Sequence, residues 1–451
     1  MLHVGMEARA ISDAARLAGL KRIVPLKIVK MVLQQSRRRR RRCGRLPAAL
    51  VLWFVLALGL FCRDCYRQVF RCLGPFCNSG LPGRSTLCEA RQSLGVRPLV
   101  LLVQRVVALL ASAGTAGAFY RGMRLMALDG FVVNVPDTPE NQRVFGTSPG
   151  ARGASAFPQV RLLALCEVGT HVIWRWLSKP VGFSEQSMCP PILRHLQTGM
   201  LLLWDRNFLS WPRFGQVVAA GAHLLARVQS QQVFRPLKRL PDGSYLARLY
   251  PSGDHRRRES GGVLVRIIAY TFGDPHRPGA GQKHRLLTTL LDPALDPAER
   301  LVALYHERWE EELTIDELKN HQLERPVLRS QTPAGVIQEL YAVLLDHYIL
   351  RVLMHEAAAL VHLPPRQLSF TGTVKILRCR IAEYPSQPSG QLRWWHNLLA
   401  EIAQEPLPPR RNRINPRVIK RKMSKWKKKR PQHYQHPQPT MPFVDSVRML
   451  R

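Results

Sequence analysis

Two short apolar runs, each carrying an aspartate, constrain this chain most. Residues 125–135 (LMALDGFVVNV) and 200–205 (MLLLWD) have the composition of buried strands, and Asp129 and Asp205 stand at or near the ends of their apolar stretches. Strand ends in α/β sheets commonly present functional side chains. If the two strands are neighbours, their carboxylates converge and can bind divalent cations. The pattern predicts an α/β fold, although an aspartate before a glycine is also a common turn.

The charge balance indicates what the protein binds. Lys and Arg total 67 against 31 Asp and Glu, a formal net charge of +36 over 451 residues. An excess of this size repels itself unless a polyanion neutralises it, which favours a nucleic acid over an anionic membrane surface. A hydrophobic content of 46% with 22% charged residues excludes wholesale disorder. The length suffices for two or three domains.

One apolar stretch must be judged as a possible membrane anchor. Residues 46–62 carry no charge and follow six consecutive arginines at 37–42. The stretch is at the short end of the roughly 17–25 residues that a spanning helix needs, and Pro47 stands near its start. A buried helix of an N-terminal domain explains it equally well, and we expect no membrane association. A chain found in the membrane fraction would contradict this expectation.

The nine cysteines do not indicate a secreted disulfide scaffold. Their number is odd and the chain is long, so we expect reduced thiols and a cytoplasmic protein. Cys62, Cys65, Cys72 and Cys77 could together bind zinc, but their spacing is not that of a standard zinc site. Zinc is therefore kept only as an alternative.

Periodicity and turn residues divide the rest of the chain. Residues 160–167 and 171–176 are predicted as a hairpin around Gly169, and short β-rich pieces separated by turns fill 222–291. Long helices are predicted at 299–323 and 333–363. The segment 410–430 holds 12 Lys or Arg and no acid, which is typical of non-specific, salt-dependent contact with DNA.

A second pattern links four polar residues in the acid-rich segment 299–324. Tyr305, Arg308, Glu312 and Lys319 follow the spacing Tyr-x2-Arg-x3-Glu-x6-Lys. On one straight helix they would form a single narrow stripe about 21 Å long. One acid among cations suits a metal ligand beside a phosphate backbone. The pair Arg308 and Glu312 could also be a plain i,i+4 salt bridge.

These residues resemble a known family. The chain is similar to bacterial insertion-sequence transposases of the DDE class, in the large family (number four) that carries this Tyr-Arg-Glu-Lys signature. DGFVVNVPDTPEN at 129–141 and DRNFLS at 205–210 resemble the first and second aspartate blocks, and residues 328–351 resemble the segment after the glutamate. Residues 37–61 and 414–426 resemble the N-terminal domain and the basic tail. Phe131 and Asn207 depart from the usual Thr and Gly, away from the expected ligands.

The resemblance implies a fold and a division into domains. We expect an α/β, ribonuclease H-like catalytic core interrupted by a β-rich insertion, with a helical N-terminal domain and a basic C-terminal tail. The expected parts are an end-binding domain at 1–110, the first part of the core at 120–225, the insertion at 226–292, the core helix with the glutamate at 298–365, and a basic region at 366–451.

The resemblance also implies a mechanism. Asp129, Asp205 and Glu312 would be catalytic and would hold two Mg²⁺ ions, for which Mn²⁺ is expected to substitute. Tyr305 and Arg308 would hold the phosphate near the scissile bond, and Lys319 and Arg206 would be further DNA contacts. The expected partners are double-stranded DNA, both inverted-repeat ends and target, and a second copy in a synaptic dimer, in the bacterial cytoplasm beside the nucleoid.

Two other functions are compatible with the same residues. A ribonuclease H-like nuclease would cut DNA without joining it, and the appearance of strand-transfer products would eliminate it. A catalytically silent protein would bind transposon ends without chemistry. An intact set of three acids favours the enzyme over such a relic.

Overall fold

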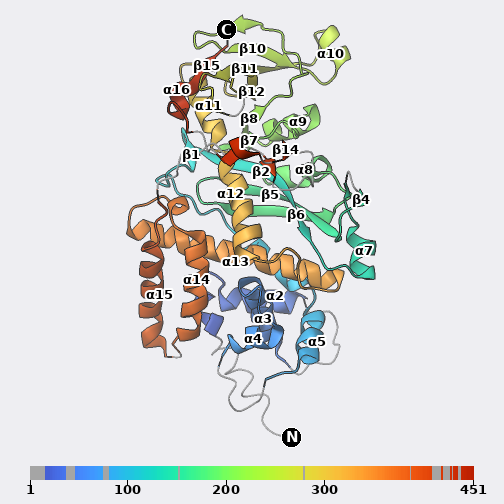
Figure 1. Ribbon diagram of the computed structural model, residues 1–451, viewed down its shortest axis with the longest axis vertical. Coiled ribbons are helices and arrows are strands. Elements are labelled where there is room, and N and C mark those ends of the chain that lie inside the picture. Colours follow the sequence, from blue (N-terminus) through green and yellow to red (C-terminus); the bar gives the residue numbers. More distant parts are fainter. Residues whose placement is uncertain are drawn as a thin grey trace.

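The architecture was determined from a computed structural model, which describes residues 16–36, 46–74, 81–150, 153–277, 280–385, 387–408, 418–419, 427–428, 430–434 and 438–450. A long twisted sheet forms one part of the molecule, and helices from both ends of the chain form the other (Figure 1). The longest helix, α13 (Pro333–Leu360), lies between these two parts. The arginine run at 37–42 and most of the basic segment 410–430 lie outside the described residues.

The sheet contains eleven strands in the order β6-β5-β2-β7-β8-β12-β11-β10-β9, with β1 beside β2 and β15 beside β11. Strands β2, β7 and β8 are parallel to one another, and the other pairs are antiparallel. The bounds are β1 (Phe119–Tyr120), β2 (Met123–Asn134), β5 (Gln159–Glu167), β6 (Val172–Pro180), β7 (Met200–Trp204), β8 (His223–Arg227), β9 (Lys238–Arg239), β10 (Tyr245–Leu249), β11 (Val263–Phe272), β12 (His284–Thr288) and β15 (Val447–Met449).

The β-rich segment 226–292 continues this sheet. Strand β8 pairs with β7 on one side and with β12 on the other, so the hydrogen bonding runs unbroken from the strand before Asp205 into the expected insertion. The chain also returns to this region at its other end, because β15 pairs with β11 through Tyr270 and Met449. Neither pairing follows from local sequence patterns.

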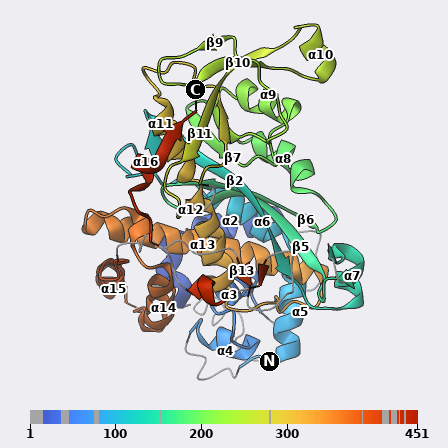
Figure 2. The ribbon, with the colours of Figure 1, turned by 45° about the horizontal axis from the view of Figure 1, so that its top comes forward.

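Helices near the N-terminus pack against α13 (Figures 1 and 2), and in the view of Figure 1 they lie below it. Helix α3 is buried from Leu50 to Leu60, because apolar side chains occupy its whole circumference. Gly59 allows α3 to approach α13 closely: a Cβ atom there would lie 2.7 Å from the main chain of Ala342. The bounds are α2 (Leu26–Ser36), α3 (Ala48–Leu60), α4 (Tyr66–Arg71), α5 (Arg84–Leu94) and α6 (Arg97–Val106).

The apolar stretch 46–62 therefore forms a helix of the protein interior. Across the described parts of the chain, no helix has both the length and the apolar character that crossing a bilayer requires. Smaller helices complete the fold: α7 (Pro139–Phe145), α8 (Glu185–Leu193), α9 (Trp211–Ala219), α10 (Gly253–Arg257), α14 (Phe370–Arg380), α15 (Pro388–Ala403) and α16 (Phe443–Ser446).

The prediction of one straight helix over 299–323 is wrong. Helix α11 (Ala298–His306) ends where the amides of Glu307 and Arg308 turn to acceptors three residues back instead of four. Helix α12 (Trp309–Asp316) follows, and it widens into a π-helical turn, η2 (Glu317–Gln322), in which bonds reach five residues back. A tightened and then a widened turn change the angle per residue, so the expected single stripe is not formed.

The expectation that Asp129 precedes a turn is also wrong. Strand β2 continues through Asp129 and Gly130 to Asn134, and Asp129 pairs with Ala164 of β5. The strand that ends near Asp129 is β7, the parallel neighbour of β2. Its last residue, Trp204, pairs with Leu128. The neighbouring-strand part of the expectation holds, because β2 and β7 are adjacent.

Candidate active site

Asp129 lies within β2 and Asp205 directly follows β7, the adjacent parallel strand, so the two aspartates stand at the same level of the sheet. Leu128 pairs with Trp204, so each aspartate is the next residue after a paired position. One oxygen of each carboxylate is oriented locally: Asp129 Oδ1 accepts a hydrogen bond from the amide of Gly130 at 2.8 Å, and Asp205 Oδ1 accepts one from the amide of Arg206 at 2.7 Å. The other oxygens take no part in these bonds and remain for a ligand.

Asp129 lies in an environment that disfavours its ionised form, chiefly through burial. Burial raises the pKa of its carboxyl to about 6, the carboxylates of Glu185 and Glu312 act in the same direction, and the Gly130 amide and Arg308 offset only part of this. An ionised Asp129 therefore carries a charge that the surrounding side chains do not fully compensate. A bound cation would supply the missing charge.

A cavity of about 500 Å³ brings Asp129, Glu312 and Lys319 together. Glu185, the first residue of α8, and Arg161 of β5 also line it, and they form an ion pair at 2.9 Å. Glu185 was missed by the sequence analysis, since an acid in the first turn of a helix is ordinary there. The one sequence signal is Gly130, because a glycine inside a strand can mark the close approach of another group. Here the side chain of Glu185 occupies the space where a Cβ atom of residue 130 would stand.

Arg308 and Tyr305 approach the site from the helix break. Arg308 Nη2 lies 3.2 Å from Glu312 Oε1, so the expected i,i+4 ion pair is present within the candidate site. The hydroxyl of Tyr305 is buried and donates a hydrogen bond to the carbonyl of Trp204 at 3.3 Å. Burial raises the pKa of Tyr305 above its usual range. Tyr305 therefore contacts the strand that carries Asp205, and its burial gives a direct phosphate contact no support.

Lys319 and Arg206 differ in how exposed they are to solvent. Lys319 belongs to η2 and lines the same cavity as Asp129 and Glu312; burial lowers the pKa of its ammonium group, and Asp316 offsets part of this change. Arg206 is exposed just after β7. Lys319 therefore lies beside Asp129 and Glu312, whereas Arg206 directly follows Asp205 in the chain and is not among the residues that line this cavity.

A buried network of charged side chains holds the segment that carries Glu312. His171 contacts Glu310 through Nε2 at 3.0 Å and Glu317 through Nδ1 at 3.0 Å, and Arg351 of α13 forms an ion pair with Glu317. His347 reaches the second oxygen of Glu317 at 3.4 Å. These bonds fix α12 between the β5–β6 turn and α13. In the sequence, Glu310 and Glu317 could not be told from surface acids.

The three predicted ligands differ in how well their chemistry and their spacing fit a divalent cation. Asp129, Asp205 and Glu312 offer hard oxygen donors, and Asp129 lies where burial leaves its charge uncompensated, which suits Mg²⁺. Within the described ranges, however, no three or more His, Cys, Asp or Glu side chains lie close enough to hold one ion. The carboxylate donors therefore suit a divalent cation, but in the described residues the three carboxylates do not lie close enough together to hold one ion.

The cysteine cluster gives little support to zinc. Cys62 is buried, donates its thiol hydrogen to the carbonyl of Gly59 at 3.0 Å, and has a pKa raised by burial to about 12. A zinc ligand must be a thiolate, which this environment disfavours. Cys65 is exposed, and Cys77 lies outside the described residues.

Comparison with protein families identifies the class. The family described as the transposase DDE domain matches residues 120–347, which is half of the chain, and the chain therefore belongs to the DDE transposases. The N-terminal region of insertion element 4 transposases matches residues 14–104 and narrows the assignment to that group. The resemblance found in the sequence is confirmed, and with it the class of enzyme: a transposase that cleaves and joins DNA.

The chain is also similar to individual proteins. The transposase InsG for insertion sequence element IS4 of Escherichia coli (strain K12) is 26% identical over 441 residues, covering 94% of this chain and 98% of that protein. The putative transposase InsZ of the same organism is 26% identical over 170 residues, covering 38% of this chain and 56% of its own length. A piggyBac transposase synaptic complex with hairpin DNA has a TM-score of 0.45 at 10% identity, covering 87% of this chain and 85% of that one.

Proposed function

We propose that this transposase cuts DNA at the ends of its insertion sequence and joins them to a target, using Asp129, Asp205 and Glu312 as metal ligands and catalytic residues. The observation that carries the proposal is the meeting of β2, β7 and α12: Asp129 in β2 stands level with Asp205 at the end of the adjacent parallel strand β7, and Glu312 shares a cavity with Asp129. Glu312 also influences the pKa of Asp129, which supports their proximity.

The three acids would hold two Mg²⁺ ions, with Mn²⁺ as a substitute. When bound, two divalent cations supply activation of the attacking water or 3′-hydroxyl and stabilisation of the leaving oxyanion. Asp129 and Asp205 offer the carboxylate oxygens that do not accept the local amide hydrogen bonds. Glu312 is kept oriented by Arg308, and their ion pair must rearrange if both oxygens of Glu312 are to face a metal.

The cationic side chains around the acids would receive the DNA. Arg308 can hold a phosphate through two parallel hydrogen bonds from its planar guanidinium group. Lys319 would add a point charge next to the acids, and the exposed Arg206 would add a further charge at the surface. Tyr305 is proposed instead to support the end of β7, because its hydroxyl bonds the carbonyl of Trp204, directly before Asp205. Its substitution by Phe would then change DNA affinity less than the loss of Arg308.

Further parts of the proposal concern fold and assembly. The mixed sheet with parallel β2, β7 and β8, covered by helices, supports a ribonuclease H-like core, and the five-part domain division stays a proposal alongside it. Joining two ends requires both in one complex, so we propose a synaptic dimer acting on double-stranded inverted repeats and target DNA. We also propose that it works in the bacterial cytoplasm beside the nucleoid, where target DNA lies.

A cleavage assay tests the proposed site. Wild type, Glu312→Gln and Glu299→Gln are incubated with Mg²⁺ and linear DNA that carries the element's own end. Glu312→Gln keeps side-chain size but removes a ligand charge, so cleavage should fall by at least about a thousandfold. Glu299 is exposed in the first turn of α11, and its variant should cut like wild type.

The outcomes separate the alternatives. Equal cutting by Glu312→Gln and wild type would make Glu312 a mere surface acid and overturn the proposed triad. Cutting without strand-transfer products, when target DNA is added, would favour a nuclease. Binding of the end by every protein with no cutting by any would favour a silent end-binding protein.

A further inference from the structure

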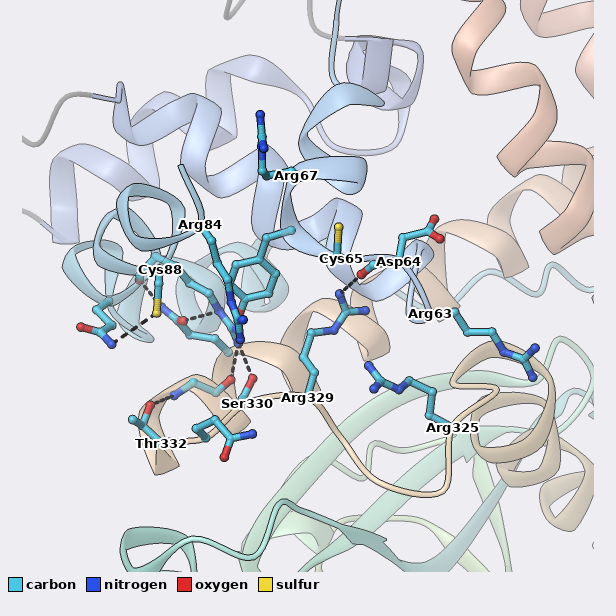
Figure 3. A pocket seen from close by; sticks show the side chains of 16 residues that line it. Arg63, Asp64, Cys65, Arg67, Arg84, Cys88, Arg325, Arg329, Ser330 and Thr332 are labelled. Atoms are coloured by element: carbon cyan, nitrogen blue, oxygen red, sulfur yellow. Dashed lines mark hydrogen bonds between the residues drawn. The ribbon is translucent and has the colours of Figure 1, made fainter. Parts of the chain in front are cut away.

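A second cavity, about 470 Å³ in volume, lies between the N-terminal helices and the start of α13 (Figure 3). Its walls come from the turn after α3, from α4 and α5, and from the loop 323–332 that follows the catalytic segment. Six arginines and a single aspartate line it: Arg63, Arg67, Arg84, Arg91, Arg325, Arg329 and Asp64. We name this the arginine cleft.

Two of these arginines have structural roles. Arg91 is buried and bonds the side chains of Gln338, Tyr66 and Ser330. Arg329 donates to the main-chain carbonyls of Asp64 and Phe61 and forms an ion pair with Glu339 at 3.4 Å. These bonds join the N-terminal helices to α13 and account for the floor of the cleft without a ligand.

The other four arginines lie on the rim and are exposed. Arg63 contacts Glu324, and Arg325 donates to the carbonyl of Cys62 at 3.3 Å, so each crosses from one side of the cleft to the other. Among the described residues, the side chains of Arg67 and Arg84 make no hydrogen bond or ion pair. Like charges gathered without counter-charges destabilise one another unless an anion joins them.

We propose that the arginine cleft binds the sugar–phosphate backbone of duplex DNA, independently of base sequence. The inference rests on the proposed function for its ligand, and it names a binding site that the catalytic residues do not include. A phosphodiester backbone matches a cleft whose open rim carries several guanidinium groups, since each can bond a separate phosphate. A single small anion would leave most of the rim uncompensated.

Residues that line the two cavities lie close together in the sequence. Lys319 lines the cavity of Asp129 and Glu312, and Arg325 lines the arginine cleft only six residues later, after η2 ends at Gln322. Thr332 caps the N-terminus of α13 at the same wall, where the helix dipole adds to the positive potential. One duplex reaching both cavities would be held beside the cut by the core and the N-terminal helices together.

A binding experiment without metal tests this site. Affinity for a 30-base-pair duplex of arbitrary sequence is measured in EDTA at several salt concentrations, for wild type and for Arg67→Ala/Arg84→Ala. Two lost phosphate contacts should weaken binding by about tenfold or more and reduce the slope of log K against log salt by about 2. Arg67→Lys/Arg84→Lys should recover most of the affinity, because a phosphate accepts a point charge.

The matched control removes the same charge elsewhere. Arg256 and Arg258 are exposed on and next to α10, at the opposite end of the molecule from α4 and α5 (Figure 1). Arg256→Ala/Arg258→Ala should stay within about twofold of wild type. Equal affinity of Arg67→Ala/Arg84→Ala and wild type, or an equal loss in the control, would overturn the cleft. Failure of wild type to bind the duplex would overturn it too.

The natural thiols give a second readout on the unmodified chain. Cys65 is exposed and lines the cleft, whereas Cys379 is exposed on α14 and does not. Duplex DNA should slow the alkylation of Cys65 by iodoacetamide severalfold and leave Cys379 unchanged. Unchanged reaction of Cys65 would contradict the proposal. Because both experiments contain no Mg²⁺, a failure of the cleavage chemistry does not alter their outcome.

Discussion

Asp129 combines a structural cost with a proposed chemical role. Its position between β7 and α12 buries a carboxylate near Glu185 and Glu312, and this raises its pKa to about 6. Such strain is common where proteins hold charges for catalysis. The residue was found from the sequence because it is an acid in an apolar run. Its electrostatic environment was not, because Glu185 comes from a distant helix.

Replacing Asp129 with Asn should therefore stabilise the metal-free protein. A folded-state pKa raised from the ordinary 3.8 penalises the ionised form, so the destabilisation is fully present above pH 6 and disappears as pH falls below 4. In EDTA at pH 8 the variant should gain about 1–3 kcal/mol, seen as a higher melting temperature. Adding Mg²⁺ should raise the melting temperature of wild type only.

The comparison at low pH is the control. At pH 4.5, where most of the carboxyl is protonated in the folded protein, the two proteins should melt much closer together. A variant that is less stable than wild type at pH 8 would mean that Asp129 makes stabilising contacts which outweigh its burial.

The segment that carries Glu312 is held as a unit by buried charges on its inner side. Burial alone would raise the pKa of Glu317, but Arg351 and His171 hold it well below its usual range. His171 adopts a left-handed backbone conformation, with φ of 58°, and its ring reaches both Glu310 and Glu317. This uncommon backbone conformation is kept because both bonds are made.

Glu317→Gln should be strongly destabilising. The substitution leaves Arg351 buried without its counter-charge, and breaking a buried ion pair from one side costs about 3–5 kcal/mol. Urea unfolding at pH 7 measures the loss. Since the folded-state pKa of Glu317 is depressed, its contribution is present above pH 4.5 and is lost as pH falls, so wild type and variant should converge in acid.

An exposed ion pair provides the control for this network. Glu383 pairs with Arg380 at 2.9 Å while more than half of its side chain is exposed, and Glu383→Gln should change stability by less than about 0.5 kcal/mol. A similarly small effect of Glu317→Gln would show that the buried network does not hold α12.

The elements of this fold were predictable to different degrees. Strands β2, β5, β6 and β7 and helix α13 follow from apolar runs and turn residues, which act locally. The break between α11 and α12 was missed because no Gly or Pro marks it. It reflects tertiary demands: Tyr305 packs into the core beneath β7, whereas Glu312 must face the cavity.

At the scale of the molecule, no local sequence pattern indicates the pairing of β15 with β11. Strand β15 joins β11, and Val447 packs in the same apolar cluster as Tyr305, Leu201 and Leu203. Nothing local in residues 447–449 distinguishes a strand that will find a partner far back in the chain. The same limit applied to β8 and β12, through which strands of the expected β-rich insertion join the sheet.

Val447→Asp should lower the stability of the whole sheet. A carboxylate placed at this buried position lacks a partner, and the expected cost is about 3 kcal/mol or more. Val444→Asp, three residues earlier and 57% exposed, should cost less than about 0.5 kcal/mol. Thermal unfolding of both variants checks this, and equal melting temperatures would mean that β15 adds little to the fold.

The two outer strands of the sheet limit how copies of the protein can assemble. Strand β9 is two residues long and presents the exposed Lys238 and Arg239, while β6 ends in Lys179 and Pro180. Short edges with lysine or proline resist the addition of another strand. A continuous sheet between protomers, or its uncontrolled growth into fibrils, is thereby disfavoured. Two copies brought together on DNA must then meet through helices, loops or the nucleic acid itself.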